Sequence, residues 1–182
     1  MDITGSSDDR LYLRTWREED APALVEAAHE SVASVGPWLP WCRADYGLDD
    51  ALAWIAHCQT GWASGDHFAF PVFEADSGRL LGATGLSQHN RLHRSANLGY
   101  WVRESCQRRG VAVAAARRVA RFGFSQLGLV RIEIVILPDN LASHGVARSL
   151  GAKFEAVARQ KLWVDGRARD AAVYGWIPRD LD

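Results

Sequence analysis

Hydrophobic residues in the first third of the chain change from a two-residue to a helical spacing. Residues 11 to 16, LYLRTW, alternate leucine with polar positions, which predicts a half-buried strand. The following REEDAPALVEAAHESV has acidic residues in its first turn and apolar residues three and four apart, so we expect a helix from about residue 18. Two prolines in GPWLPWC interrupt it. The apolar spacing from Asp49 predicts a second helix that ends at residues 65 to 67.

The middle of the chain returns to a two-residue period. Residues 67 to 87 predict two antiparallel strands joined by a turn at 76 to 78, and residues 96 to 102, ANLGYWV, predict a third strand. Pro71 has no N–H to donate, so we expect it at a bulge or a sheet edge. The intervening QHNRLHR is expected to be a loop.

The strongest helical pattern of the sequence covers residues 110 to 127, where apolar residues recur at steps of three and four. RIEIVIL, residues 131 to 137, then predicts a buried strand. The segment PDN breaks the pattern and offers Asn140 as the N-cap of a further helix. That helix is expected to close on Gly151, a left-handed C-cap.

The final segments are AKFEAVARQKLWV and RDAAVYGWI, two predicted strands around a turn at Asp165 and Gly166. The whole order predicts one α/β (α+β) domain with a mixed, mostly antiparallel sheet of about seven strands and about four helices. Residues 96 to 137 form a crossover, so its two strands should lie parallel, with ligand space where they end. We expect a flexible N-terminus over residues 1–10 and a single domain over 11–180.

Composition narrows the class of protein without naming an activity. The 182 residues are 48% hydrophobic and 24% charged, which is typical of a globular domain. A net charge of -1 gives no long-range attraction for polyanions, so the balance disfavours a dedicated nucleic-acid binder. No apolar stretch fits a signal peptide or a membrane span, so we expect a cytoplasmic protein without a membrane partner.

The cysteines and histidines do not predict a metal site. Cys42, Cys58 and Cys106 are odd in number and widely spaced, which favours reduced thiols over a disulfide framework or a CxxC site. His89 and His93 are close in sequence, but we place them in a loop where their rings need not share a face. No metal is expected.

The stretch Gln107 to Ala112, QRRGVA, falls at a predicted strand-to-helix junction. The first N–H groups of a helix are unpaired and its dipole is positive there, so the geometry suits a pyrophosphate. Gly110 would let the main chain approach such a ligand without a Cβ in the way. Arg108 and Arg109 either add charge or face water. Further along the helix, three arginines are expected on its solvated face: Arg117, Arg118 and Arg121.

QRRGVA resembles the QxxGxA loop that holds the pyrophosphate of coenzyme A in the GNAT acetyltransferase superfamily. The element order resembles a GNAT domain from about Leu11 to Asp180. GYWVRESCQRRG, LPDNLASHGVARSLGAKFEA and VYGWIPRD resemble the Rim-type branch, which acetylates N-termini of ribosomal proteins. GPWLPWC resembles the tryptophan-rich first loop of that branch.

This resemblance implies acetyl-CoA as co-substrate. It implies that the strand Leu98 to Val102 pairs through its main chain with the pantetheine arm, and that an N–H there polarises the acetyl oxygen. In Rim-type enzymes the residue at Asn140 contacts pantetheine and that at Ser143 lies near the thioester sulfur, as an acid or a water-holder. A helix cap alone would also explain both. The expected cofactor-binding residues are Tyr100, Trp101, Val102, Gln107, Arg108, Arg109, Gly110, Val111, Ala112, Asn140 and Ser143.

The general base departs from the family pattern. Many relatives carry Glu before the LGYW segment, where this chain has Asn97, and an amide cannot accept the proton. Candidate substitutes are Glu133, Glu104, a histidine from the 89–93 loop, or a water chain to solvent. Asn97 is expected beside the acceptor, together with two tryptophans that could equally form a subunit contact: Trp38 and Trp41.

The resemblance therefore implies an enzyme that moves an acetyl group from acetyl-CoA to a primary amine by direct attack. A protein or peptide N-terminus is the favoured acceptor. Three alternatives stay open: a small amine such as an amino acid, polyamine or antibiotic; a coenzyme A-binding module without catalysis; and a nucleic-acid binder that uses the arginine-rich helix. A homodimer is also kept open.

Overall fold

The computed structural model describes residues 10–181. The flexible N-terminus expected over residues 1–10 lies, except for Arg10, outside the described residues. Within residues 10–181, none of the helices has the length and apolar character needed to cross a membrane.

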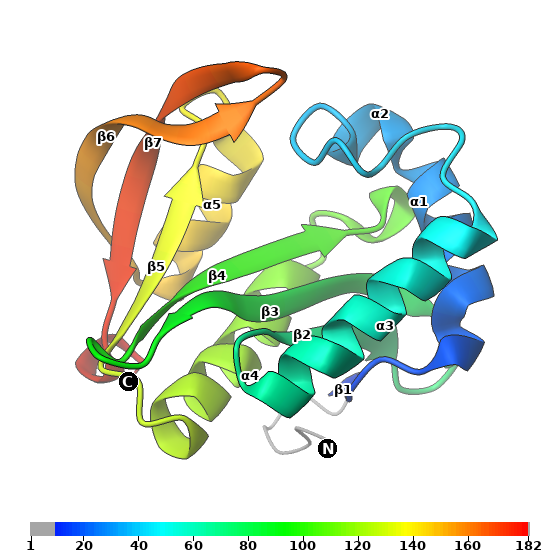
Figure 1. Ribbon diagram of the computed structural model, residues 1–182, viewed down its shortest axis with the longest axis horizontal. Helices are drawn as coiled ribbons and strands as arrows, with labels where there is room; N and C mark the ends of the chain where they lie inside the picture. Colours follow the sequence, from blue (N-terminus) through cyan, green and yellow to red (C-terminus); the bar gives the residue numbers. More distant parts are fainter. Residues whose placement is uncertain (1–9, 182) are drawn as a thin grey trace.

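One seven-stranded sheet runs through the molecule in the order β1-β2-β3-β4-β5-β7-β6 (Figure 1). Every neighbouring pair is antiparallel except β4 and β5, so the prediction of a mixed, mostly antiparallel sheet is confirmed. The strands are β1 (Leu11–Leu13), β2 (Phe68–Glu74), β3 (Leu80–Asn90), β4 (Ser95–Val102), β5 (Arg131–Ile136), β6 (Lys153–Val164) and β7 (Arg167–Trp176).

Helices cover the two faces of the sheet in separate layers. On one face, α4 and α5 pack over a core that includes Leu98, Val119 and Ile132. On the other face, α1 and α3 pack over a second core around Trp16 and Ile55. The helices are α1 (Ala21–Glu30), α2 (Val32–Val35), α3 (Leu48–Ser64), α4 (Val111–Gln126) and α5 (Leu141–Leu150), with three short 3-10 turns, η1 (Glu18–Asp20), η2 (Glu104–Cys106) and η3 (Pro178–Asp180).

The sheet opens between β4 and β5. These parallel strands are paired only at their beginnings, from Ser95 opposite Arg131 to Asn97 opposite Glu133. Beyond that point β5 continues with β7 and separates from β4, and Figure 1 shows the two strands diverging toward the end of the sheet that carries α2. The predicted crossover is thereby confirmed, and it leaves one edge of β4 open in the middle of the sheet.

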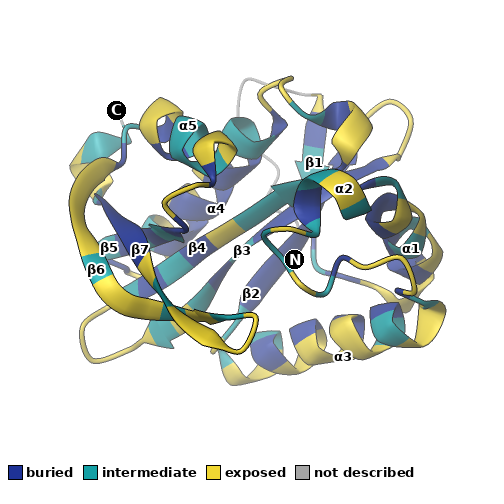
Figure 2. Cartoon of the chain, turned by 90° about the horizontal axis from the view of Figure 1, so that it is seen from above, coloured by how far each residue is buried: buried dark blue, intermediate teal, exposed yellow. Residues whose placement is uncertain are grey.

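Beyond this opening, β6 and β7 continue as a two-stranded arm. β7 pairs with β5 only as far as Ala172, so residues 158–171 pair only with each other. Asp165 and Gly166 at the tip have φ of 51° and 70°, the left-handed geometry of a tight hairpin turn. Most of the arm is exposed (Figure 2), and Trp163 is 76% exposed.

Three local predictions need correction. The expected first helix stops at Glu30, and α2 adds a short third helix before β2. β3 extends through Asn90, which shortens the expected QHNRLHR loop to a turn at residues 91–94. Arg118 is not on a solvated face: it is 6% exposed, and its guanidinium donates to the carbonyl of Leu11. The long side chain of Arg118 thus reaches the edge strand β1, a contact that helical periodicity does not reveal.

Two predictions about backbone detail hold. Pro71 lies within β2, one residue from a register shift between Val72 and Phe73, as expected for a proline near a bulge. Gly151 closes α5 with a φ of 86°, and its N–H bonds back into the last turn.

Candidate cofactor and acceptor site

The open edge of β4 presents main-chain groups in a fixed order. Thr84 of β3 donates its hydroxyl to the carbonyl of Gly99, at 2.9 Å, so the polar groups of Gly99 face β3. Successive residues of a strand turn these groups to opposite edges. The C=O group of Leu98 and the N–H and C=O groups of Tyr100 therefore face the opening, whereas the N–H of Leu98 still takes part in the pairing of Asn97 with Glu133.

The loop between β4 and α4 has two residues with left-handed backbone geometry just before the helix. Arg108 and Gly110 both have positive φ, 60° and 78°, and Gly110 is the N-cap of α4. The N–H groups of the first helical turn, from Val111, have no carbonyl four residues earlier in the helix. A Cβ built on Gly110 would meet no atom within 4 Å, so the space beside this loop is open. This geometry fits an anionic group.

The Gln107 side chain is used within the protein. Its amide nitrogen donates to the carbonyl of Val102, at 3.0 Å, and to the hydroxyl of Ser34, at 3.2 Å. The bond to Val102 ties the loop to the end of β4. Gln107 therefore shapes the loop, while Arg108 and Arg109 are exposed beside it.

The N-terminus of α5 lies against β4 across the opening. Asn140 caps the helix by accepting a hydrogen bond from the N–H of Ser143 at 3.1 Å. The hydroxyl of Tyr100 donates to the carbonyl of Ser143, also at 3.1 Å. Burial raises the pKa of Tyr100, which keeps its hydroxyl protonated. Three residues expected to share the cofactor site are thus brought together.

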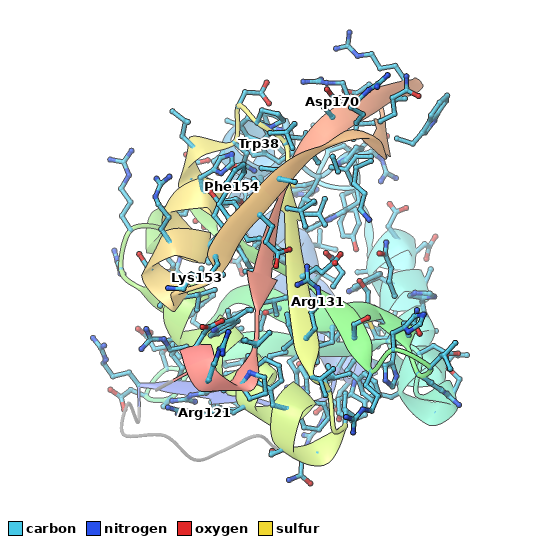
Figure 3. All side chains as sticks on the ribbon, turned by 90° about the vertical axis from the view of Figure 1, so that its left-hand side faces the viewer. Trp38, Arg121, Arg131, Lys153, Phe154 and Asp170 are labelled. Carbon is cyan, nitrogen blue, oxygen red and sulfur yellow. The ribbon has the colours of Figure 1, made fainter. Side chains whose placement is uncertain are left out.

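On the face of the sheet toward α3, Asn97 and Glu133 are neighbours in the paired part of β4 and β5. The Asn97 Oδ1 atom is buried and has no hydrogen-bond partner in the structure. Oε1 of Glu133 accepts two hydrogen bonds from Arg131, which also pairs with Glu155 of β6. Arg131 is labelled at β5 in Figure 3, and its guanidinium extends over β7, where a Cβ added to Gly175 would lie 2.7 Å from Nη1. Strand parity thus places the side chains of Glu133 and Asn97 on the same face of the sheet. Arg131 is bonded to one of the two carboxylate oxygens of Glu133.

The two tryptophans of the first loop have different surroundings. Trp41 packs edge-on against Trp101 of β4, at 5.3 Å between ring centroids, and against Tyr46. Trp41 is therefore largely a packing residue, and it fixes the loop to the sheet. Trp38 is half-buried, and its main-chain N–H donates to the carbonyl of Val35 at the end of α2.

Some predicted site residues lie elsewhere. Trp101 turns its carbonyl toward β3, since a Cβ on Gly82 would lie 2.2 Å from that oxygen. Its main chain is thus directed away from the opening. His89 and His93 lie at the closed end of β4, where β3 turns into it, and Glu104 lies in η2. Within residues 10–181, no group of three or more His, Cys, Asp or Glu side chains could hold a metal ion.

The sequence did not reveal how α1 holds the cofactor loop. Arg103, at the end of β4, is 4% exposed and pairs with Glu26 and Glu30 of α1. Glu30 also accepts the N–H of Ser105 at 2.9 Å. The partners lie more than 70 residues apart in sequence, so a charged residue of a surface helix gives no local signal of this role.

The pH dependence of stability should report this contact. Burial alone would raise the pKa of Glu30, but hydrogen bonds from Ser105 and Arg103 lower it from 4.5 to about 2. A depressed carboxyl pKa stabilises the folded state above the unfolded value, and this contribution is lost as the pH falls toward 2. The urea midpoint of the wild type should therefore exceed that of Glu30→Gln by much more at pH 6 than at pH 3. An equal difference at both values would contradict the lowered pKa.

The split sheet, the glycine-capped helix after β4 and the capped α5 opposite Tyr100 reproduce the arrangement that the sequence resemblance implied. This fold and site define the class of the acetyl-CoA-dependent N-acetyltransferases.

Comparison with known proteins gives the same class. A family model described as "Acetyltransferase (GNAT) domain" matches residues 10–153. The chain therefore belongs to the GNAT acetyltransferase family. It is 28% identical to YoaA, an uncharacterized N-acetyltransferase of Bacillus subtilis, over 94% of this chain and 96% of that protein.

Two further similar proteins are named for ribosomal proteins. It is 26% identical to the [ribosomal protein uS5]-alanine N-acetyltransferase of Escherichia coli, over 89% of this chain and 84% of that enzyme. Its fold matches a structure of RimL, a ribosomal α-N-protein acetyltransferase, in complex with coenzyme A, with a TM-score of 0.87 and 22% identity over all of both chains.

Proposed function

We propose that this protein transfers the acetyl group of acetyl-CoA to the N-terminal α-amine of a protein. The observation that carries the donor assignment is the continuity of the site. The open main-chain edge at Leu98 and Tyr100 continues into the loop of Gly110, so one elongated ligand with amide groups and a phosphate end would satisfy both.

The residues present fit coenzyme A in three places. The edge of β4 from Leu98 to Val102 would pair with the amides of the pantetheine arm. The N–H groups of Val111 and Ala112, reached past Gly110, would hold the pyrophosphate, with Arg108 and Arg109 adding charge at the rim. Asn140 and Ser143 would lie toward the thioester, on the α5 side of the opening.

When bound, acetyl-CoA supplies an electrophilic thioester. In the transfer, the amine nitrogen forms a bond to the acetyl carbon, the carbon–sulfur bond breaks, the amine loses a proton and the thiolate gains one. A main-chain N–H of β4 would polarise the acetyl oxygen. The Ser143 hydroxyl would provide the proton for the thiolate, directly or through water.

The groups that would remove the proton from the amine lie on the α3 side of the sheet. The buried, unpaired Oδ1 of Asn97 would accept a hydrogen bond from the amine or from a water beside it. Oε2 of Glu133, which takes no part in the bonds to Arg131, is the base candidate in the same register. The demand on a base is modest, since a free α-amine has a pKa of about 8 and is partly neutral already.

A protein acceptor is supported by the arm of β6 and β7. The arm carries the exposed Trp163 and four basic residues, Arg159, Lys161, Arg167 and Arg169. Tryptophan and arginine are enriched where proteins contact one another, and a small amine would leave this surface without a role. The E. coli relative named for ribosomal protein uS5 supports the same kind of acceptor.

Acceptor panels test this proposal. Release of free thiol from acetyl-CoA should be at least about tenfold faster, as kcat/KM, with a folded protein bearing a free N-terminus than with amino acids or polyamines, an advantage of about 1.4 kcal/mol. Trp163→Ala should reduce the rate with the protein while leaving the small-amine rate unchanged. Trp54→Ala, which removes an exposed tryptophan from α3, is the matched control.

A preference for the small amines would establish the alternative acceptor class. Tight binding of acetyl-CoA without turnover on any acceptor would leave only a coenzyme A-binding module. For the nucleic-acid alternative, binding that shows no salt dependence would dispose of it.

The cellular setting follows from the same proposal. The three cysteines are buried and unpaired in the structure, which suits a reducing cytoplasm, where ribosomal proteins are made. The proposal requires no metal, membrane or nucleic-acid partner. A homodimer, in which Trp38 could contact a second copy, is measurable by light scattering.

A further inference from the structure

The loop that would hold the pyrophosphate is fixed from outside by α1 and α2. Glu30 accepts the N–H of Ser105, and the hydroxyl of Ser31 accepts the N–H of Glu104 at 3.1 Å. Ser34 of α2 accepts a hydrogen bond from the side chain of Gln107. Three successive parts of the chain between β4 and α4 are therefore bound to a helix pair that lies more than 70 residues earlier.

Charge strengthens the contact at Glu30. The guanidinium of Arg103 is almost fully buried and donates to Glu30 through Nε and to Glu26 through Nη2. The Glu30 side chain is 27% exposed, whereas that of Glu26 is 68% exposed. Hydrogen bonds to a charged group are stronger than neutral ones, above all where water is excluded. Glu30 is thus the strongest link between α1 and the loop.

These bonds act on main-chain geometry. Arg108 holds a positive φ of 60° within a few residues of the bound segment, and for a residue with a Cβ such a conformation persists only where the surroundings fix it. A phosphate site made of main-chain N–H groups needs those groups to converge before the ligand arrives.

We propose that Glu30 is a positioning residue for the coenzyme A pyrophosphate. It contacts no ligand and acts by holding the chain from Arg103 to Ser105, so that the N–H groups at the start of α4 point at one anion. This inference rests on the proposed function, because it assumes that coenzyme A occupies the loop.

The structure offers a matched pair of variants for the test. Glu30→Ala and Glu26→Ala each remove one charged partner of Arg103, but only Glu30→Ala also removes the acceptor of the Ser105 N–H. By calorimetry, Glu30→Ala should raise the Kd for coenzyme A about tenfold, while Glu26→Ala should change it less than about twofold. Equal effects of both variants would overturn the inference.

A truncated donor separates positioning from general damage to the fold. S-acetylpantetheine has the thioester but no pyrophosphate. Glu30→Ala should lower kcat/KM for acetyl-CoA about tenfold and leave that for S-acetylpantetheine unchanged. An equal loss with both donors would show that Glu30 serves only the fold.

A milder variant covers the case in which Glu30→Ala does not fold. Glu30→Gln keeps an oxygen that can accept the N–H of Ser105 and loses only the charge that faces Arg103. It should raise the Kd for coenzyme A about threefold, and an unchanged Kd would overturn the inference. A wild type that does not bind coenzyme A would instead refute the proposed function itself, so the two failures are distinguishable.

Discussion

Replacing Gly110 by valine is expected to weaken the binding of coenzyme A about 100-fold, a loss of about 2.7 kcal/mol. The expected cause is obstruction, because a side chain here would project into the open space beside the first N–H groups of α4. A ligand that lies against the main chain would collide with it. Calorimetric titration with coenzyme A measures the change.

Backbone strain must be separated from this obstruction, and Gly128 allows it. Gly128 follows the other end of α4, has a φ of 63°, and its added Cβ would also meet no atom within 4 Å. Gly110→Val and Gly128→Val should therefore lower the melting temperature to a similar extent, and only the first should lose affinity. Unchanged affinity for coenzyme A in Gly110→Val would show that the pyrophosphate does not bind at this loop.

Ser143→Ala is expected to lower kcat about 100-fold with little change in the affinity for acetyl-CoA, since loss of a general acid has effects of this order. The hydrogen bonds that Ser143 makes in the structure, to Asn140 and from Tyr100, use its main chain. Alanine preserves both, so the variant tests the hydroxyl alone. Steady-state kinetics with a protein acceptor gives the two parameters.

Ser149→Ala is the matched control for that experiment. Ser149 lies on the same helix, and its carbonyl accepts a hydrogen bond from Arg117. Its substitution should leave both parameters unchanged. If Ser143→Ala also turns over at the wild-type rate, the hydroxyl has no part in the transfer.

Sequence periodicity predicted the strands, the long helices and the crossover because these depend on local patterns of two and 3.6 residues. Two caps were also predicted, since Asn140 begins α5 and Gly151 closes it as expected. The short α2 was missed, because a helix of four residues is too short to show a period.

The site was predictable only where its chemistry is local. The loop from Gln107 to Ala112 could be placed because its glycine and its position in the chain are visible in the sequence. The ion pair between Glu133 and Arg131 could not be predicted in the same way, because it depends on which face of the sheet each side chain points to. Arg118 was wrongly predicted to face water, as charged residues on helices ordinarily do. In the structure its guanidinium reaches a carbonyl of β1.

The open edge of β4 also bears on how such a site can persist through evolution. The groups that it offers to a ligand belong to the main chain, and every residue type supplies the same carbonyl and, except for proline, the same N–H. The side chains at these positions are instead constrained by packing, Leu98 in the core and Tyr100 against Ser143. An alignment of relatives would therefore record how this edge packs and not its capacity to bind a ligand.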